Sequence, residues 1–206
     1  MKFLTLLLTT LSLLLPNLAG AQTPDTPPDV LVKNVTNEVL AIVRKDKDIQ
    51  SGNHQKAIDL VETKVLPHFD FTRMTQLSLG RDWRKATPEQ QKTLADQFRT
   101  LLVRTYSSAL NGYKNQVIEF KPFKMKPGDT DVKVQTQISQ SGSRPIPLDY
   151  YLEKLPQGWK VYDIEVDGIS LVINYRESFA SEVRRGGIEG LIKTLQAKNR
   201  SDAAGK

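Results

Sequence analysis

The stretch 132–166, VKVQTQISQSGSRPIPLDYYLEKLPQGWKVYDIEV, determines the fold class of this chain. Within it apolar residues recur at every second position in three runs, which is the pattern of half-buried β-strands. The runs are separated by Ser141-Gly142-Ser143 and by Pro156-Gln157-Gly158, and turns this short join antiparallel neighbours. One more apolar run comes before the stretch, ahead of Pro127-Gly128-Asp129. The sequence therefore predicts an antiparallel meander of about four strands, at 116–124, 132–138, 146–152 and 159–166.

Helical periodicity lies on both sides of this meander. Thr87, Pro88 and Gln90 form the clearest helix start, a capping box with proline at the first helical position. Gly186-Gly187 interrupts the last helical pattern. Helices grouped before and after a run of strands indicate an α+β domain, in which helices cover one face of a curled sheet and make a cone. The predicted helices begin near Asp29, His54, Pro88, Gly168 and Ile188.

The first residues of the chain predict export from the cytoplasm. Lys2, the apolar run Phe3–Leu15, Pro16 and the small residues Ala19-Gly20-Ala21 have the layout of a secretory signal peptide. The apolar run is shorter than the ~20 residues that a membrane-spanning helix needs. We therefore expect a cleaved signal over 1–21, a flexible proline-rich lead-in over 22–28, a single domain over 29–198 and a frayed tail over 199–206.

The composition excludes several classes of function. The chain has no cysteine, so thiol chemistry, disulfides and thiolate metal sites are ruled out. Its length suits one domain with a substantial core. The formal net charge of +6 fits contact with anionic lipid or an acidic partner. The basic residues form no arginine-rich block and no aromatic–basic stripe, so we expect no nucleic-acid partner.

The histidines give little support to an enzyme. There are two of them, His54 and His68. His68 and Asp70 could be drawn as a base with its orienting carboxylate, but residues two apart on a helix do not face each other. A surface histidine near a helix end is the favoured interpretation.

A row of carboxylates on the last strand has two interpretations. Asp163, Glu165 and Asp167 alternate and so share one face, which would suit a cation site if their oxygens converged. The favoured alternative is a solvated face, with Tyr162, Ile164 and Val166 directed inward. We therefore expect no catalytic residues and no metal.

The end of the meander resembles a known family. WKVYD at 159–163, VDGISL at 166–171 and NYRESF at 174–179 resemble the MlaC family, also called the toluene-tolerance family. Trp83, IPLDY at 146–150 and GIEGLI at 187–192 resemble it as well. The resemblance extends over nearly all of the chain that follows the predicted signal.

The resemblance implies a fold, a place and a function. The fold is a nuclear transport factor 2-like domain with added helices, located in the periplasm, without cofactor or catalytic residues. The cargo is a phospholipid, carried between an outer-membrane lipoprotein–porin complex and an inner-membrane ABC transporter with an MCE-domain ring. That transport maintains outer-membrane lipid asymmetry. We expect a monomer.

Two alternatives stay open. The first is a ligand-free periplasmic adaptor with a solid core, and the second is an enzyme of the same cone fold.

The apolar pattern also predicts which residues face the inside of the cone and hold acyl tails. Trp159 and Tyr175 are interpreted as structural, and Asp163 and Arg176 as a pair where the last strand meets the following helix. The predicted lipid-binding residues are Val65, Phe69, Met74, Leu101, Leu102, Tyr106, Val134, Ile138, Tyr150, Ile164, Val166, Ile169 and Val172.

Overall fold

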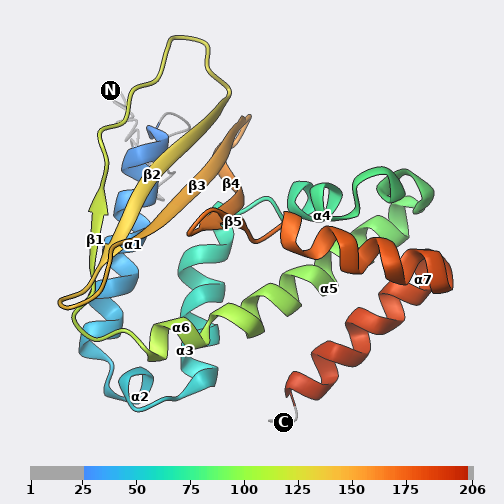
Figure 1. Ribbon diagram of the computed structural model, residues 1–206, viewed down its shortest axis with the longest axis horizontal. Helices are drawn as coiled ribbons and strands as arrows, with labels where there is room; N and C mark the ends of the chain where they lie inside the picture. Colours follow the sequence, from blue (N-terminus) through green and yellow to red (C-terminus); the bar gives the residue numbers. More distant parts are fainter. Residues whose placement is uncertain (1–25, 204–206) are drawn as a thin grey trace, which may run out of the picture.

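The computed structural model describes residues 26–203, and Figure 1 shows its helices and strands. The predicted signal 1–21, most of the lead-in 22–28 and the last residues of the chain lie outside the described residues. The helical elements are α1 (Pro28–Lys45), α2 (Lys47–Gln50), α3 (His54–Leu60), η1 (Val61–Val65), η2 (Leu66–His68), α4 (Phe71–Leu79), η3 (Gly80–Lys85), α5 (Pro88–Tyr106), α6 (Ser108–Asn111), η4 (Ile173–Tyr175) and α7 (Arg176–Ala203). The strands are β1 (Val117–Phe120), β2 (Asp131–Ser139), β3 (Ile146–Leu155), β4 (Gly158–Val166) and β5 (Ile169–Ser170).

The strands form one antiparallel sheet in the order β1-β2-β3-β4-β5. Each strand pairs with its neighbour in sequence, as the short turns predict. The α+β fold class is confirmed, and the sheet has five strands rather than about four because β5 folds back on the end of β4.

A bulge in β4 changes which residues of that strand face the helices. Leu152 of β3 lies opposite Val161, but its neighbour Tyr151 lies opposite Asp163, so Tyr162 is an extra residue. An extra residue resets the alternation of a strand. Val161 before the bulge and Ile164 after it consequently line the same cavity, described below.

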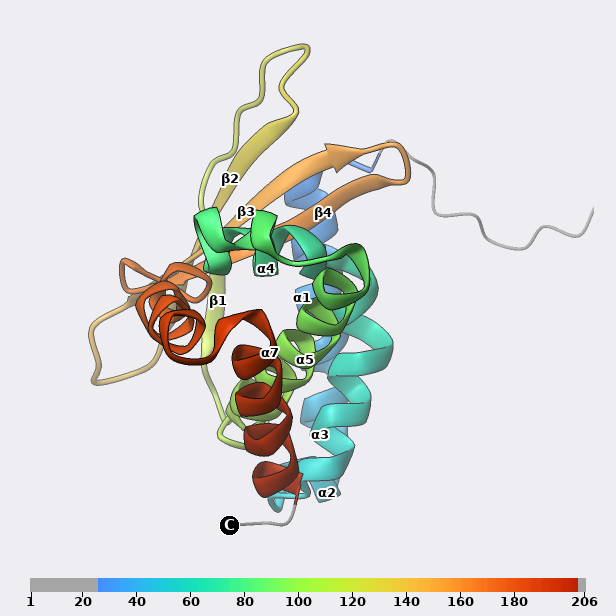
Figure 2. The ribbon, with the colours of Figure 1, turned by 90° about the vertical axis from the view of Figure 1, so that its right-hand side faces the viewer.

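The helices form two groups. Helix α1 lies along one face of the sheet, and α3 stands beside it (Figure 1). Helices α4, α5 and α7 pack on one another, and α4 also contacts β4; Figure 2 shows α5 and α7 side by side below α4. The buried apolar residues accordingly form three clusters: one among α4, α5 and α7, one between α1 and the sheet, and one where α1, α2 and α3 meet.

Local sequence sets the start of α5 and the bend within α7. In α5 the capping box forms as predicted, with the Gln90 N–H donating to Thr87 Oγ1 at 3.2 Å and the Thr87 N–H to Gln90 Oε1 at 3.0 Å. This helix ends at Tyr106. Helix α7 bends at Gly187, whose φ of 66° lies in the region that favours glycine.

The first and last helices extend slightly outside the range 29–198. Helix α1 begins at Pro28, inside the expected lead-in, since proline in the first turn loses no helical hydrogen bond. Helix α7 continues to Ala203, beyond the expected start of a frayed tail. Asn199 is buried there, and its amide donates to the carbonyl oxygen of Gln97 at 3.0 Å. Across residues 26–203, no helix has the length and apolar character needed to cross a bilayer.

Candidate functional site

Two apolar cavities lie where the sheet, α1 and the other helices meet. Cavity A has a volume of about 230 Å³ and cavity B of about 210 Å³, and carbon atoms make up nearly all of both linings. Cavity A is lined by Leu31, Val32, Val35, Thr36, Val39, Leu40, Val65, His68, Phe69, Leu110, Ile118, Tyr150, Val161 and Ile164. Cavity B is lined by Val61, Val65, Leu66, Phe69, Phe71, Met74, Leu102, Val103, Tyr106, Ser107, Leu110, Ile164 and Leu171.

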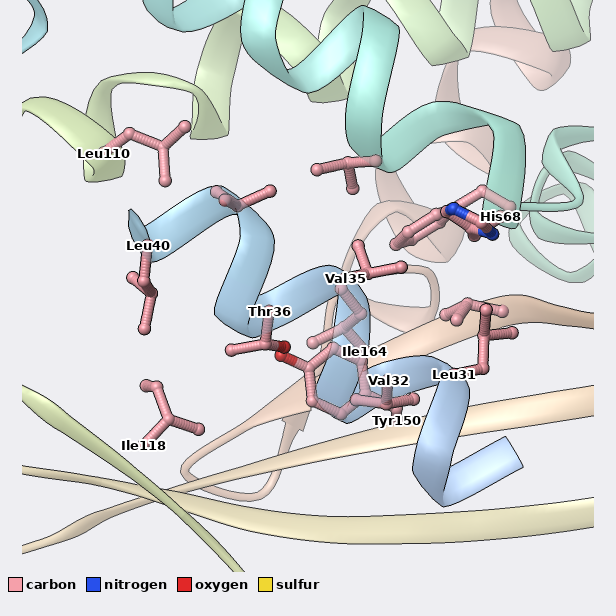
Figure 3. A pocket seen from close by; sticks show the side chains of 14 residues that line it. Leu31, Val32, Val35, Thr36, Leu40, His68, Leu110, Ile118, Tyr150 and Ile164 are labelled. Atoms are coloured by element: carbon pink, nitrogen blue, oxygen red, sulfur yellow. The ribbon is translucent and has the colours of Figure 1, made fainter. Parts of the chain in front are cut away.

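Cavity A is the space between α1 and the concave side of the sheet. Figure 3 shows Tyr150 rising from β3 toward Thr36 on α1, with Leu40 and Ile118 on opposite sides of the open space. Helix α1 contributes Thr36 and Leu40 to the lining because its sheet-facing side carries an apolar residue at every turn. The same helix keeps its charged residues on the other side, toward solvent.

Cavity B lies between α5 on one side and the segment η1–α4 on the other. Leu102, Val103 and Tyr106 of α5 face Phe71 and Met74 across it. Tyr106 is 38% exposed, so cavity B reaches the surface at the end of α5.

The two cavities share one wall. Val65, Phe69, Leu110 and Ile164 line both of them. Val65 belongs to η1, a π-helical turn, and such turns interrupt a regular helix most often at functional sites. The cavities are therefore adjoining parts of one apolar interior, separated by a few side chains.

Phe69 is held in this wall by the backbone. It makes an isolated bridge with Val161 of β4, and the adjacent Asp70 N–H donates to the Val161 carbonyl at 2.9 Å. Its ring stacks on Phe71 with centroids 5.9 Å apart. The segment after η2 thus joins the sheet directly and carries its aromatic rings into the site.

Burial shifts the pKa of two polar groups in the cavity A lining toward their neutral forms. Burial raises the pKa of Tyr150 to about 12, and the Thr36 hydroxyl bonds to its phenol oxygen. Burial also lowers the pKa of His68, and the charge of Lys160 lowers it further. An apolar interior with uncharged polar groups at its edge suits a hydrocarbon ligand.

The structure brings seven of the predicted lipid-binding residues to these cavities. Phe69, Val65 and Ile164 line both, Tyr150 lines cavity A, and the α4–α5 residues line cavity B. The seven are Val65, Phe69, Met74, Leu102, Tyr106, Tyr150 and Ile164.

The other six predicted residues lie elsewhere. Leu101, Val134 and Val172 are at most 1% exposed, and neither cavity lining includes them. Ile138 and Val166 are half-buried near the end of the sheet. Ile169 is 61% exposed, so the prediction that it faces inward is wrong. It lies in β5, the short strand that follows the turn after β4.

Sequence reasoning missed the contribution of α1. Its residues form about half of the cavity A lining, which includes Leu31, Val35 and Leu40. The helical periodicity from Asp29 marked an apolar face on this helix but did not reveal that the face borders a cavity rather than a filled core. Val161 and Ile118 were missed for a different reason: the bulge moves Val161 inward, and the pairing of β1 places Ile118 opposite Ile138.

The structure also shows where His68 and Asp70 lie. His68 is half-buried and lines cavity A instead of lying on the surface. Asp70 does not orient it: the carboxylate caps α4 by accepting the Arg73 N–H at 2.9 Å. In residues 26–203 no group of three or more histidines and carboxylates is placed to hold a metal ion.

The bulge at Tyr162 precedes the carboxylate row, so Asp163 and Glu165 share one face of β4 as expected, whereas Asp167 follows the end of the strand. Asp163 is 8% exposed, whereas the Tyr162 side chain points away from the cavities, with its phenol donating to Asp131 at 2.8 Å. The predicted Asp163–Arg176 pair is wrong as well. Asp163 accepts hydrogen bonds from Ser170 Oγ at 2.5 Å, Ile164 N at 2.8 Å and Val172 N at 3.2 Å. Arg176 instead donates to the carbonyl oxygen of Leu77 at 2.8 Å.

Comparison with known proteins gives one consistent result. The model of the MlaC protein family matches residues 33–197. The toluene tolerance protein ttg2D of Pseudomonas putida is 30% identical over 171 residues, which is 82% of this chain and 78% of that protein. The intermembrane phospholipid transport system binding protein MlaC of Haemophilus influenzae is 25% identical over 177 residues, 84% of this chain and 82% of that protein.

A solved structure agrees with these relatives. The phospholipid-binding protein from Ralstonia solanacearum, determined in complex with a phospholipid, is 42% identical. It superposes with a TM-score of 0.79, and the match covers 86% of this chain and 99% of that chain. The family match spans most of the chain, the relatives are similar over most of their own length, and the fold is shared. This chain therefore belongs to the MlaC family.

Proposed function

We propose that this chain is a phospholipid carrier that holds its cargo by the acyl tails in cavities A and B. The observation that carries the proposal is an apolar interior left open by the protein's own side chains. Each cavity alone is smaller than a typical ligand pocket, and together they reach the lower part of the roughly 300–1,000 Å³ range. A solved relative that contains a bound phospholipid supports the same ligand class.

The energetics favour binding through the tails. Burying a methylene group contributes ~0.8 kcal/mol. Two acyl chains of roughly sixteen carbons therefore represent on the order of 25 kcal/mol relative to water, as an upper limit for complete burial. The same free energy of burial prevents release of the lipid into water. Transfer from one apolar environment to another is nearly balanced, so lipid moves when the carrier contacts a donor or acceptor.

The cavities favour the carrier over the two alternatives. A ligand-free adaptor needs a solid core, whereas here a hydrocarbon-lined space adjoins the packed clusters. An enzyme needs a charged or titrating group directed at its substrate. The titratable side chains in the two linings are His68, Tyr106 and Tyr150, and neither lining includes a carboxylate, a lysine or an arginine among the described residues.

We extend the proposal to a wider role, which the family suggests. We place the carrier in the periplasm, where it collects and delivers phospholipid between an outer-membrane lipoprotein–porin complex and an inner-membrane ABC transporter with an MCE-domain ring. A relative named as the binding protein of an intermembrane phospholipid transport system supports this role. The chain would act as a monomer, and the partners' use of ATP would set the direction of transport.

Native mass spectrometry of the purified protein, followed by organic extraction, tests the proposal. We expect phospholipid in near-stoichiometric amounts, and uptake from phospholipid vesicles once the cargo has been removed. A bare polypeptide mass together with no uptake from vesicles would favour the ligand-free adaptor.

A further inference from the structure

A polar groove lies directly against the two apolar cavities. Its volume is about 440 Å³, and its polar lining includes Asp96, Arg99, Gln157 and Lys160. Phe69 lines this groove as well as cavities A and B, and Phe71 lines the groove and cavity B. The stacked pair Phe69–Phe71 is thus the boundary between hydrocarbon-lined space on one side and charged side chains on the other.

Among the described residues, Lys160 is one of the two cations that line the groove, and the backbone connects it directly to this boundary. It precedes Val161, the residue of β4 that bridges to Phe69. Its ammonium donates to the carbonyl oxygen of Pro67 at 2.5 Å, on the segment that leads into Phe69. The charge of Lys160 is also felt by His68 inside cavity A, where it helps to lower the imidazole pKa. Lys160 therefore lies at the junction of the groove with the apolar interior.

The other charged groups of the groove already have ionic or capping partners. Asp70 caps α4 through the Arg73 N–H at 2.9 Å. Arg99 pairs with Glu62 at 3.3 Å, and Asp96 pairs with Lys92 at 2.8 Å. The contact of the Lys160 ammonium, in contrast, is a neutral carbonyl, which leaves its charge available to an anion.

We propose that this groove receives the phosphodiester headgroup of the bound lipid, with Lys160 contacting the phosphate while the tails pass over Phe69 and Phe71 into cavities A and B. The inference rests on the proposed carrier function and adds a specificity-determining residue to it. Tail burial supplies most of the affinity, and Lys160 supplies a preference for lipids that carry a phosphate. A lysine suits this task because an ammonium binds phosphate as a point charge, without fixed geometry.

The test is competitive loading from vesicles that contain equal amounts of phosphatidylethanolamine and diacylglycerol with the same acyl chains. After incubation the protein is repurified, and the two lipids bound to it are quantified by mass spectrometry. The wild type should prefer the phospholipid. Lys160→Gln should lower the ratio of phospholipid to diacylglycerol about tenfold, which is the effect of one charge-assisted hydrogen bond. Lys160→Arg should restore the preference.

Lys193→Gln is the matched control, since Lys193 is an exposed lysine of α7 that borders neither the cavities nor the groove. It should leave the ratio unchanged. A wild type that loads both lipids equally, or a folded Lys160→Gln protein with the wild-type ratio, overturns the headgroup assignment while the carrier function stands. A wild type that loads neither lipid overturns the carrier function itself.

A final experiment distinguishes binding of the lipid headgroup in the groove from binding of free phosphate. Inorganic phosphate added during loading should leave the wild-type ratio unchanged, because the headgroup is held at the groove by its own tails. A fall of the ratio toward that of Lys160→Gln would assign the groove to free phosphate and contradict the headgroup proposal.

Discussion

Filling the shared wall of the cavities should weaken lipid binding and stabilise the lipid-free protein at the same time. Val65 lines both cavities, and its replacement by phenylalanine adds about four carbon atoms to the open space. Displacing about four methylenes of the ligand at ~0.8 kcal/mol each costs the complex roughly 3 kcal/mol, or about a hundredfold in affinity. Filling a cavity in the lipid-free protein should instead add about 0.5–2 kcal/mol to the free energy of unfolding.

Val134→Phe is the matched control for this substitution. Val134 is 1% exposed and lies in a packed cluster, so the same added ring has no open space to enter. Overpacking of this kind costs roughly 1–3 kcal/mol. The two variants should therefore shift the melting temperature in opposite directions, although they make the same chemical change.

The assay has two readouts. Thermal unfolding is followed by circular dichroism on lipid-free protein, since bound lipid would itself raise the melting temperature. Lipid loading is measured by mass spectrometry after incubation with vesicles. The reasoning fails if Val65→Phe loads lipid like the wild type, or if its lipid-free form is destabilised as much as Val134→Phe, because either result means that Val65 borders no usable cavity.

Three further predictions follow from particular contacts. Ile164→Glu should abolish lipid loading, since an unpaired charge in an apolar cavity is costly, whereas Ile169→Glu at a 61% exposed position should load normally; equal loading by both folded variants would exclude Ile164 from the site. Burial raises the pKa of Tyr150 to about 12, so the stability that its neutral phenol contributes is complete below pH ~10, the pKa of an unfolded tyrosine, and is lost as the pH rises toward 12. Tyr150→Phe should flatten that part of the melting temperature–pH profile, and an unchanged profile would contradict it. Asp163→Ala should cost about 2–4 kcal/mol in urea unfolding because it leaves buried donors unpaired, and its effect should add to that of Arg176→Ala; a coupling energy well above 0.5 kcal/mol would restore the rejected pair.

The order of the strands was predictable because its causes are local. Period-two alternation over 132–166 and turns of a few residues leave an antiparallel meander as the simple solution. The start of α5 was equally local, since Thr87, Pro88 and Gln90 carry their own capping interactions. Family membership also came from the sequence, through the motifs between Trp159 and Phe179.

The bulge at Tyr162 could not be predicted, because an inserted residue is defined only by its partner strand. Because of this bulge, Val161 and Ile164 both face the cavity. Asp163, which follows the bulge, accepts hydrogen bonds from Ser170 and Val172. Strict alternation gave the wrong direction for Tyr162 for the same reason.

Apolar periodicity indicates which side of a helix or strand is turned inward, but not whether anything fills the space there. Leu101 and Leu102 are neighbours on one apolar stripe and belong to the same packed cluster, yet Leu102 also borders cavity B and Leu101 does not. The sequence by itself determined the fold class, the family and an apolar interior. Only the tertiary structure decided where that interior stays open, because the gap depends on how far α1, η1 and α5 stand from the sheet, and that separation arises from contacts between residues distant in the chain.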